Sequence, residues 1–270
     1  MRTSLDRRQF SFLTSFLTAG VALGAPLALG PLPASAASPS TDVMLAFDRL
    51  YIPPLFLTGS AGKSADGPAR ADAALQRLVQ AWPALHDQLR AVWPRDAGWR
   101  HTLAAVQGHI RKATDLAARR QWPESHEALE AVRLDLQRAR AGRRMDYLLD
   151  RYTAFHEPME HLAAAGATAA ATPLDATARA ALEHHYAQAR ARWRDIETVP
   201  IDARALGLSP AREAQLRKAL ADEDAALAAL SDALRGRDDA ALRQAAAATK
   251  PPFVRAYTAF GLPVGEAPRS

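Results

Sequence analysis

Apolar residues recur along this chain at alternating spacings of four and three, which is the pattern of a helix with one buried face. Leu148, Tyr152, Phe155, Met159 and Leu162 follow this pattern. It returns at Leu182, Tyr186, Ala189, Trp193 and Ile196, and at Leu216, Leu220, Glu223, Leu227, Leu230 and Leu234, where the acid Glu223 interrupts the apolar stripe. Alanine, leucine, arginine and glutamate dominate the composition, which also favours helices. The sequence therefore predicts an all-α fold, a bundle of amphipathic helices around a core.

Proline, glycine and short polar stretches mark the expected helix ends. The predicted helices cover residues 42–57, 70–93, 98–120, 123–141, 145–165, 175–197, 210–235 and 238–260. Ser209-Pro210 and Trp122-Pro123 are typical of helix starts, because proline in the first turn loses no needed hydrogen bond. Pro53-Pro54, Pro158 and Pro251-Pro252 fall within or beside helical pattern, so we expect a kink or break at each.

Two stretches resemble each other and suggest a tandem duplication. Both "AFDRLYIPPLFLTG" and "LLDRYTAFHEPMEHLAAAG" contain an Asp-Arg pair, then an aromatic residue, a proline and a final glycine. A repeat of about 105 residues with four helices fits a four-helix unit. Alanine-rich helices also align by chance, so a chance match stays open. We predict two tandem four-helix units at 37–142 and 143–270, which either stand apart or pack as one domain.

Residues 1–36 have the features of an export signal. A charged head containing Arg7-Arg8 precedes a long apolar run, and Ala34-Ser35-Ala36 is the expected cleavage site. The stretch "DRRQF" resembles a twin-arginine signal, whose export machinery carries folded proteins and would be a partner of this chain. The sequence thus predicts a periplasmic protein that does not span the membrane once the signal is removed. An uncleaved signal that acts as a membrane anchor is the alternative.

Charge and cysteine content exclude several classes of function. Removing the predicted signal deletes three arginines and one aspartate, so the formal charge falls from +5 to +3. The sequence contains no basic block comparable to a nucleic-acid-binding arm, so nucleic acid is not an expected partner. The chain has no cysteine, which excludes disulfides, thiolate metal sites, iron–sulfur clusters and covalently attached haem.

The stretch "YTAFHEPMEHL" is the densest group of candidate metal ligands. On a helical wheel, His156 lies at the flank of the apolar stripe, and Glu160 follows it one turn later. This pair is expected to be half-buried. Glu157 and His161 form a second pair, but they lie on the opposite side of the helix and should face solvent.

Two other helices offer partners for His156 and Glu160. His185 lies near the apolar stripe of its helix, and Glu223 occupies a stripe position where a leucine is expected. If these four residues converge, they would form a metal site that suits iron, copper or zinc. In the competing interpretation the histidines are structural, and Glu223 pairs with Arg151 or Arg192.

Other cofactor and reaction classes have less support. Di-iron bundles use paired Glu-x-x-His motifs, which this sequence lacks. Non-covalent b-type haem would need an inward-facing axial ligand, for which Met44, His86, His156 and Met159 are candidates, and no further haem feature accompanies them. The sequence has no Gly-x-Ser-x-Gly elbow and no glycine-rich phosphate loop.

The stretches "YTAFHEPMEHL" and "ATKPPFVRAYTAFG" resemble parts of an exported, all-helical bacterial family that carries a twin-arginine signal and has no assigned reaction. The resemblance implies export and fold, and it transfers no catalytic residue. We therefore expect a non-catalytic binding or accessory protein that holds a metal ion or a small cofactor. The alternatives are a metal-dependent redox enzyme and a cofactor-free protein that binds a protein partner.

The twin-arginine interpretation predicts the outcome of a conservative double substitution. Arg7→Lys combined with Arg8→Lys keeps the charge of the head but removes the arginine pair that the export route recognises. The double variant should stop appearing in the periplasmic fraction and remain inside the cell, as measured by immunoblotting of the two fractions. Continued periplasmic accumulation would reject this route.

Overall fold

The computed structural model describes residues 39–167 and 173–261, and the predicted signal at 1–36 lies outside them. The described residues form nine α-helices and one short 3₁₀ helix, with no strand among them, which confirms the all-α prediction. The first bundle contains α1 (Pro39–Ser60), η1 (Ala61–Lys63), α2 (Gly67–Val92), α3 (Ala97–Ala118) and α4 (Trp122–Ala141). The second bundle contains α5 (Leu148–Gly166), α6 (Ala176–Glu197), α7 (Pro210–Arg235), α8 (Asp239–Ala247) and α9 (Lys250–Thr258).

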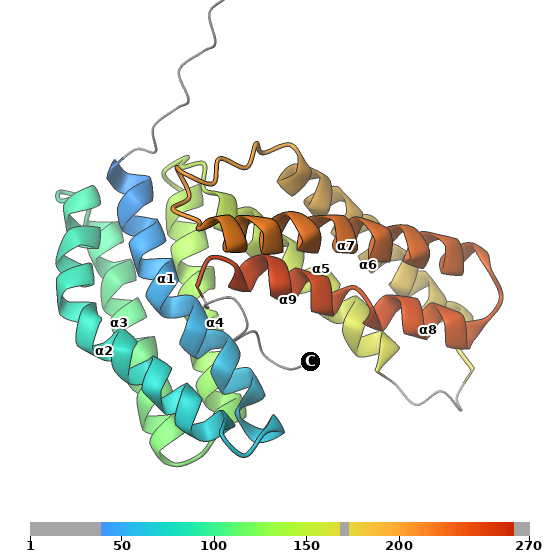
Figure 1. Ribbon diagram of the computed structural model, residues 1–270, viewed down its shortest axis with the longest axis horizontal. Helices are drawn as coiled ribbons and strands as arrows, with labels where there is room; N and C mark the ends of the chain where they lie inside the picture. The colour runs from blue at the N-terminus through green and yellow to red at the C-terminus, as the bar shows by residue number, and fades with distance from the viewer. Residues whose placement is uncertain (1–38, 168–172, 262–270) are drawn as a thin grey trace, which may run out of the picture. The chain divides into compact units, whose positions relative to one another are not determined.

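Each bundle closes around its own four helical positions (Figure 1). In the first bundle α1 packs against α2 and α4, and α3 packs against the same two helices. In the second bundle α5 and α7 each pack against α6, while α8 and α9 together fill the fourth position. The two bundles touch where α4 meets α5 and where α1 meets α9. The contacts thus agree with tandem four-helix units.

The predicted helix over 238–260 is in fact two helices, α8 and α9. Pro251 and Pro252 lack the N–H groups that would bond the carbonyls of Ala247 and Ala248. The Thr249 hydroxyl donates to the Ala246 carbonyl oxygen at 2.8 Å, which satisfies one acceptor at the end of α8. By contrast, α1 continues through its two prolines and α5 continues through its one, so neither helix is broken there.

Side-chain caps explain several of the helix starts. The Asp96 carboxylate accepts from the Trp99 amide at 2.8 Å to begin α3, and Asp175 accepts from the Ala178 amide at 2.7 Å to begin α6. Ser209 caps α7 in the same way, as its position before a proline indicated. These local signals lie in the sequence, which is why the predicted boundaries fall within a few residues of the observed ones.

Aromatic side chains fill the centre of each bundle. In the second bundle the ring of Phe155 lies 4.9 Å from that of Trp193 and 5.6 Å from that of Phe253, measured between centroids. In the first bundle Trp99 is buried, and its indole N–H donates to the Leu89 carbonyl oxygen at 2.7 Å. Trp99 therefore serves the core with its polar N–H satisfied.

A buried polar cluster joins α1, α4 and α5. Arg140 on α4 donates to the Asp150 carboxylate at the start of α5, with Nε 2.9 Å from Oδ2. Its guanidinium also lies over the ring of Tyr147, and the Tyr147 hydroxyl donates to the carboxylate of buried Asp48 on α1. Because buried charges are costly unless paired, this cluster fixes how the first helix of the second bundle meets the first bundle.

In the part of the chain that the structure describes, none of the helices has both the length and the apolar character that crossing a membrane requires.

The glycine at the end of α5 allows α8 to approach closely. A Cβ atom on Gly166 would lie 2.5 Å from the amide nitrogen of Ala247 and 2.6 Å from the carbonyl oxygen of Arg243. Both of these atoms belong to the backbone, so neither can move aside by a simple side-chain rotation. The α5–α8 contact therefore depends on the absence of a side chain at this position.

Gly166→Ala should consequently lower the free energy of unfolding by about 1–3 kcal/mol, the usual cost of overpacking. The matched control is Gly108→Ala on α3, where an added Cβ meets no atom of the described residues within 4 Å. This control should raise the free energy of unfolding by up to ~1 kcal/mol, because alanine favours the helix. Urea denaturation followed by circular dichroism distinguishes the two, and equal effects would contradict the close packing of α5 on α8.

Candidate functional site

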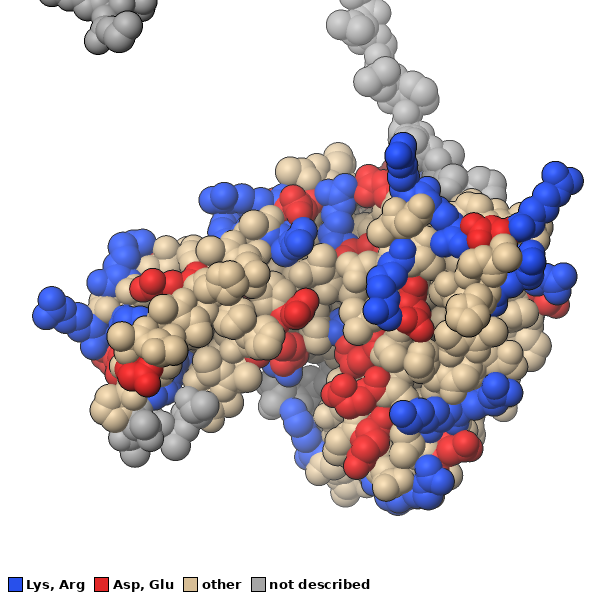
Figure 2. Space-filling view, turned by 180° about the vertical axis from the view of Figure 1, so that it is seen from behind, with Lys and Arg blue, Asp and Glu red and all other residues tan. Residues whose placement is uncertain are grey.

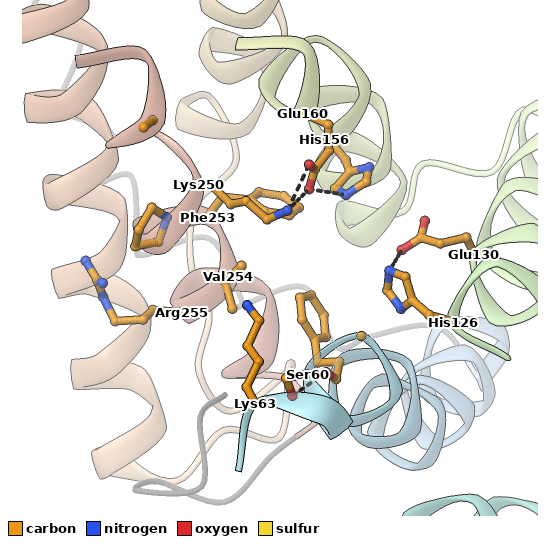
Figure 3. Close-up of a pocket in the computed structure, with 14 residues that line it drawn as sticks. Ser60, Lys63, His126, Glu130, His156, Glu160, Lys250, Phe253, Val254 and Arg255 are labelled. Atoms are coloured by element: carbon orange, nitrogen blue, oxygen red, sulfur yellow. Dashed lines mark hydrogen bonds and ion pairs between the residues drawn. The ribbon is translucent and has the colours of Figure 1, made fainter. Parts of the chain in front are cut away.

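A cavity of ≈ 420 Å³ lies between the two bundles (Figure 3). The end of α1 and the first half of α4 form its walls on one side, and α5 and α9 form them on the other. Apolar lining comes from Phe56, Pro251, Phe253 and Val254; polar and charged lining comes from Ser60, Lys63, His126, Glu130, His156, Glu160, Lys250 and Arg255. Seen from behind, the surface is hollowed between the bundles, with acidic side chains gathered beside the hollow (Figure 2).

Arg133 on α4 lies behind this lining and binds one polar residue from each side of the cavity. Its side chain is only 4% exposed. The guanidinium donates to the Glu130 carboxylate one turn earlier on α4, and to Nδ1 of His156 on α5 at 2.5 Å. A buried guanidinium requires such partners, so Arg133 orients both side chains toward the cavity.

His156 is held as a neutral ring with a single tautomer. Because an arginine can only donate, Nδ1 accepts from Arg133 and carries no proton. Nε2 then carries the proton and lies 3.2 Å from Oε1 of Glu160. Burial lowers the pKa of His156, and the charge of Arg133 lowers it further against the opposing hydrogen bond to Glu160. Both ring nitrogens are therefore engaged within the protein.

Glu160 is held in its ionised form. Burial by itself would raise its pKa, but hydrogen bonds from His156 and Lys250 outweigh burial and lower the pKa to about 2. The Lys250 ammonium lies 2.8 Å from Oε2 of Glu160 and, because His156 is neutral, supplies the neighbouring positive charge. His156 and Glu160 are thus close together and half-buried, as predicted.

His126 and Glu130 on α4 form a second pair with the same i,i+4 spacing. Neither residue is among the ligands predicted from the sequence. His126 donates through Nδ1 to the Leu55 carbonyl oxygen at 2.8 Å, so its Nε2 faces Glu130. Nε2 lies 3.6 Å from Oε1 of Glu130, beyond hydrogen-bonding distance. Gly59 on α1 makes room for this ring, because a Cβ there would lie 3.0 Å from Nδ1 of His126.

The repeated His-x-x-x-Glu spacing was the available signal for this site. His126-Glu130 and His156-Glu160 are 30 residues apart in the sequence and line the same cavity in the structure. Figure 3 shows one pair on α4 and the other on α5, and no residue of either pair comes from α6 or α7.

The other two predicted metal ligands lie in different surroundings. The ring of His185 on α6 stacks on that of His161 at 4.4 Å between centroids, and neither residue lines the cavity. Among the described residues, no group of three or more His, Cys, Asp or Glu side chains is arranged to hold a metal ion. The structure thus brings together His156 and Glu160 but not the set of four, and metal binding by that set stays a prediction.

Glu223 on α7 is fully buried, and neither carboxyl oxygen has a hydrogen-bond partner among the described residues. The expected pairing with Arg151 or Arg192 is wrong. Arg151 instead binds the Asp146 carboxylate at 2.9 Å, and Arg192 is exposed. Burial raises the pKa of Glu223 to about 9, which the nearby Phe253 amide and Arg255 only partly offset. Glu223 is therefore protonated at neutral pH.

Comparison with known proteins gives no relative: no protein-family model, no curated protein and no solved structure matches this chain. The interpretation of the cavity therefore depends on its own geometry and chemistry.

The buried acid predicts a pH-dependent stability. The native state keeps the proton of Glu223 up to a pKa of about 9, whereas the unfolded chain loses it near the ordinary value of 4.5. Between these values the native state binds more protons, so the contribution of Glu223 to stability falls as pH rises. Glu223→Gln should remove this loss and should stabilise the protein more at pH 8 than at pH 5, by on the order of 1 kcal/mol per pH unit.

Urea denaturation of the two proteins at both pH values measures this difference. Glu183→Gln, at an exposed position of α6, is the matched control and should show no such trend. A stabilisation by Glu223→Gln that does not change with pH would show that Glu223 is ionised in the native state.

Proposed function

We propose that this protein is an exported binding protein that holds a small organic molecule in the cavity between its bundles. The observation that carries the proposal is the cavity itself. Its volume of ≈ 420 Å³ lies within the range of small-molecule sites, and its lining combines an apolar surface with a few oriented polar groups. Both bundles contribute to the lining, and the junction between two domains is a common place for a ligand-binding site.

The His156–Glu160 pair supports binding better than acid–base catalysis. A general base needs a lone pair that can reach the substrate, and a general acid needs a transferable proton. His156 has both nitrogens engaged, and Glu160 is held ionised by Lys250. These side chains are fixed in place by one another, which is the property of a preorganised binding surface.

The surface supports a small ligand over a protein partner. A docking face for another protein commonly shows a contiguous apolar patch. Among the described residues, the exposed large hydrophobic side chains are Val79 on α2 and Leu134 on α4, which lie on helices that are not neighbours in the first bundle. The interior of the cavity, by contrast, offers a concave apolar surface from Phe56, Phe253 and Val254.

Export is the second part of the proposal. The arginine pair, apolar run and cleavage motif within residues 1–36 support passage through the twin-arginine route to the periplasm. A fold that closes two bundles around a cavity suits a route that carries folded proteins. The resemblance to an exported helical family also supports export.

An uncharged fluorescent dye tests whether the cavity accepts organic molecules. Nile red, which becomes fluorescent in apolar surroundings, should bind the purified protein with a saturable, single-site signal. Val254→Trp places an indole in the cavity and should abolish the signal, while circular dichroism and thermal stability stay close to those of the parent. Val79→Trp, which adds the same side chain to an exposed position of α2, is the matched control. Equal dye binding by both variants would refute the cavity as the site.

A further inference from the structure

The cavity contains a pair of acceptor atoms with no donor between them. His126 donates its Nδ1 proton to the Leu55 carbonyl oxygen, and the neutral tautomer that this bond selects has its lone pair on Nε2. Glu130 gives one carboxylate oxygen, Oε2, to Arg133, and turns the other, Oε1, toward His126. The two facing atoms are 3.6 Å apart, which is too far to bond each other but close enough to share one donor.

One ammonium group in the lining has no acid to bind among the described residues. Lys63 in η1 makes no ion pair with the described residues, and Figure 3 shows its side chain rising from the segment that follows α1. The other two cations of the lining are engaged: Lys250 binds Glu160 at 2.8 Å, and Arg255 binds Asp222 at 2.9 Å. Lysine is also scarce here, since Lys63 and Lys250 are two of only four lysines in the chain.

An apolar surface accompanies these polar groups in the lining. Phe56, from the end of α1, and Phe253 and Val254, from α9, contribute this apolar surface. A ligand that satisfies all three regions must therefore have a donor, an anionic group and an apolar body.

We propose that the ligand is a small zwitterion with an apolar body, an amino acid or a close analogue. Its ammonium group would donate to Nε2 of His126 and Oε1 of Glu130, its carboxylate would pair with Lys63, and its apolar part would lie on Phe253 and Val254. This assignment rests on the proposed function, because it names the chemical class of the ligand for the same cavity.

A bare metal cation fits the acceptor pair less well than an ammonium group. Zinc and similar ions need about four ligands at short distances, and here one nitrogen and one oxygen face each other. The second oxygen of Glu130 is already held by Arg133, whose positive charge lies directly behind the pair. An ammonium group needs only hydrogen-bond acceptors and leaves the bond between Glu130 and Arg133 intact.

Three probes with the same phenyl body separate the two polar ends. Phenylalanine carries both charged groups, hydrocinnamate lacks the ammonium group, and phenethylamine lacks the carboxylate. Isothermal titration calorimetry should show phenylalanine binding more tightly than either truncated probe by about tenfold or more, as expected for the loss of one charge-assisted hydrogen bond.

Two substitutions test the ends separately. His126→Asn retains a side-chain N–H for the Leu55 carbonyl oxygen but removes the Nε2 acceptor, so phenylalanine should weaken while hydrocinnamate is unaffected. Lys63→Met retains the length of the side chain but removes its charge, so phenylalanine should weaken while phenethylamine is unaffected. The matched controls are His101→Asn and Lys112→Met, both at exposed positions of α3, and neither should alter any affinity.

The outcomes distinguish this inference from the function on which it rests. If hydrocinnamate binds as tightly as phenylalanine, or if His126→Asn leaves the preference unchanged, the ammonium site is refuted while a binding cavity stands. If Nile red binds but none of the three probes does, the zwitterion is likewise refuted. If neither the dye nor any probe binds, the proposed function itself is refuted.

Discussion

Two buried arginines on one face of α4 determine how the two bundles meet. Arg133 and Arg140 are seven residues apart, which is two helical turns, and they are 4% and 3% exposed. An unpaired guanidinium in such surroundings would cost several kcal/mol, so each needs an acid or another acceptor within reach. Arg140 takes the Asp150 carboxylate and Arg133 takes Nδ1 of His156, both on α5. Since the two acceptors are also nearly two turns apart, α5 has one favourable register along α4, and the position of the cavity follows from it.

The two bundles meet where α4 contacts α5 and α1 contacts α9, and we call this junction the seam. The resemblance between the two halves of the sequence has a physical counterpart there. The aspartates of the two Asp-Arg pairs, Asp48 and Asp150, both lie beside Arg140. Burial raises the pKa of Asp48 to about 6 although Arg140 opposes the shift, and the hydroxyl of Tyr147 donates to its carboxylate. The glycines that end the two stretches correspond as well. Gly59 admits the ring of His126 on α4, and Gly166 admits the backbone of α8. In both bundles a glycine near the end of the first helix therefore leaves room for the fourth position of the bundle.

Much of the fold could be predicted from the sequence, because periodicity, caps and prolines act within a single helix. The same local signals placed His156 at the flank of α5 and next to Glu160. They could not identify His126, because a helical wheel reports the face that is buried in its own bundle, and the cavity lies between bundles. The helical wheel also placed His185 and Glu223 toward the bundle interior, but it could not show which side chains they contact. His185 meets His161, and Glu223 meets no polar partner among the described residues, because α6 and α7 lie away from the seam.

The seam and the proposed binding site share one series of polar contacts. It runs from Lys250 through Glu160, His156 and Arg133 to Glu130, and so from α9 through α5 to α4. At its end Glu130 has two carboxylate oxygens, one for Arg133 and one that faces the cavity. A ligand that donates to the second oxygen need not take the first from Arg133, so binding and the packing of the bundles do not compete. Such a ligand would instead contact walls from both bundles, and because it binds only the assembled seam, it would stabilise that assembly by mass action.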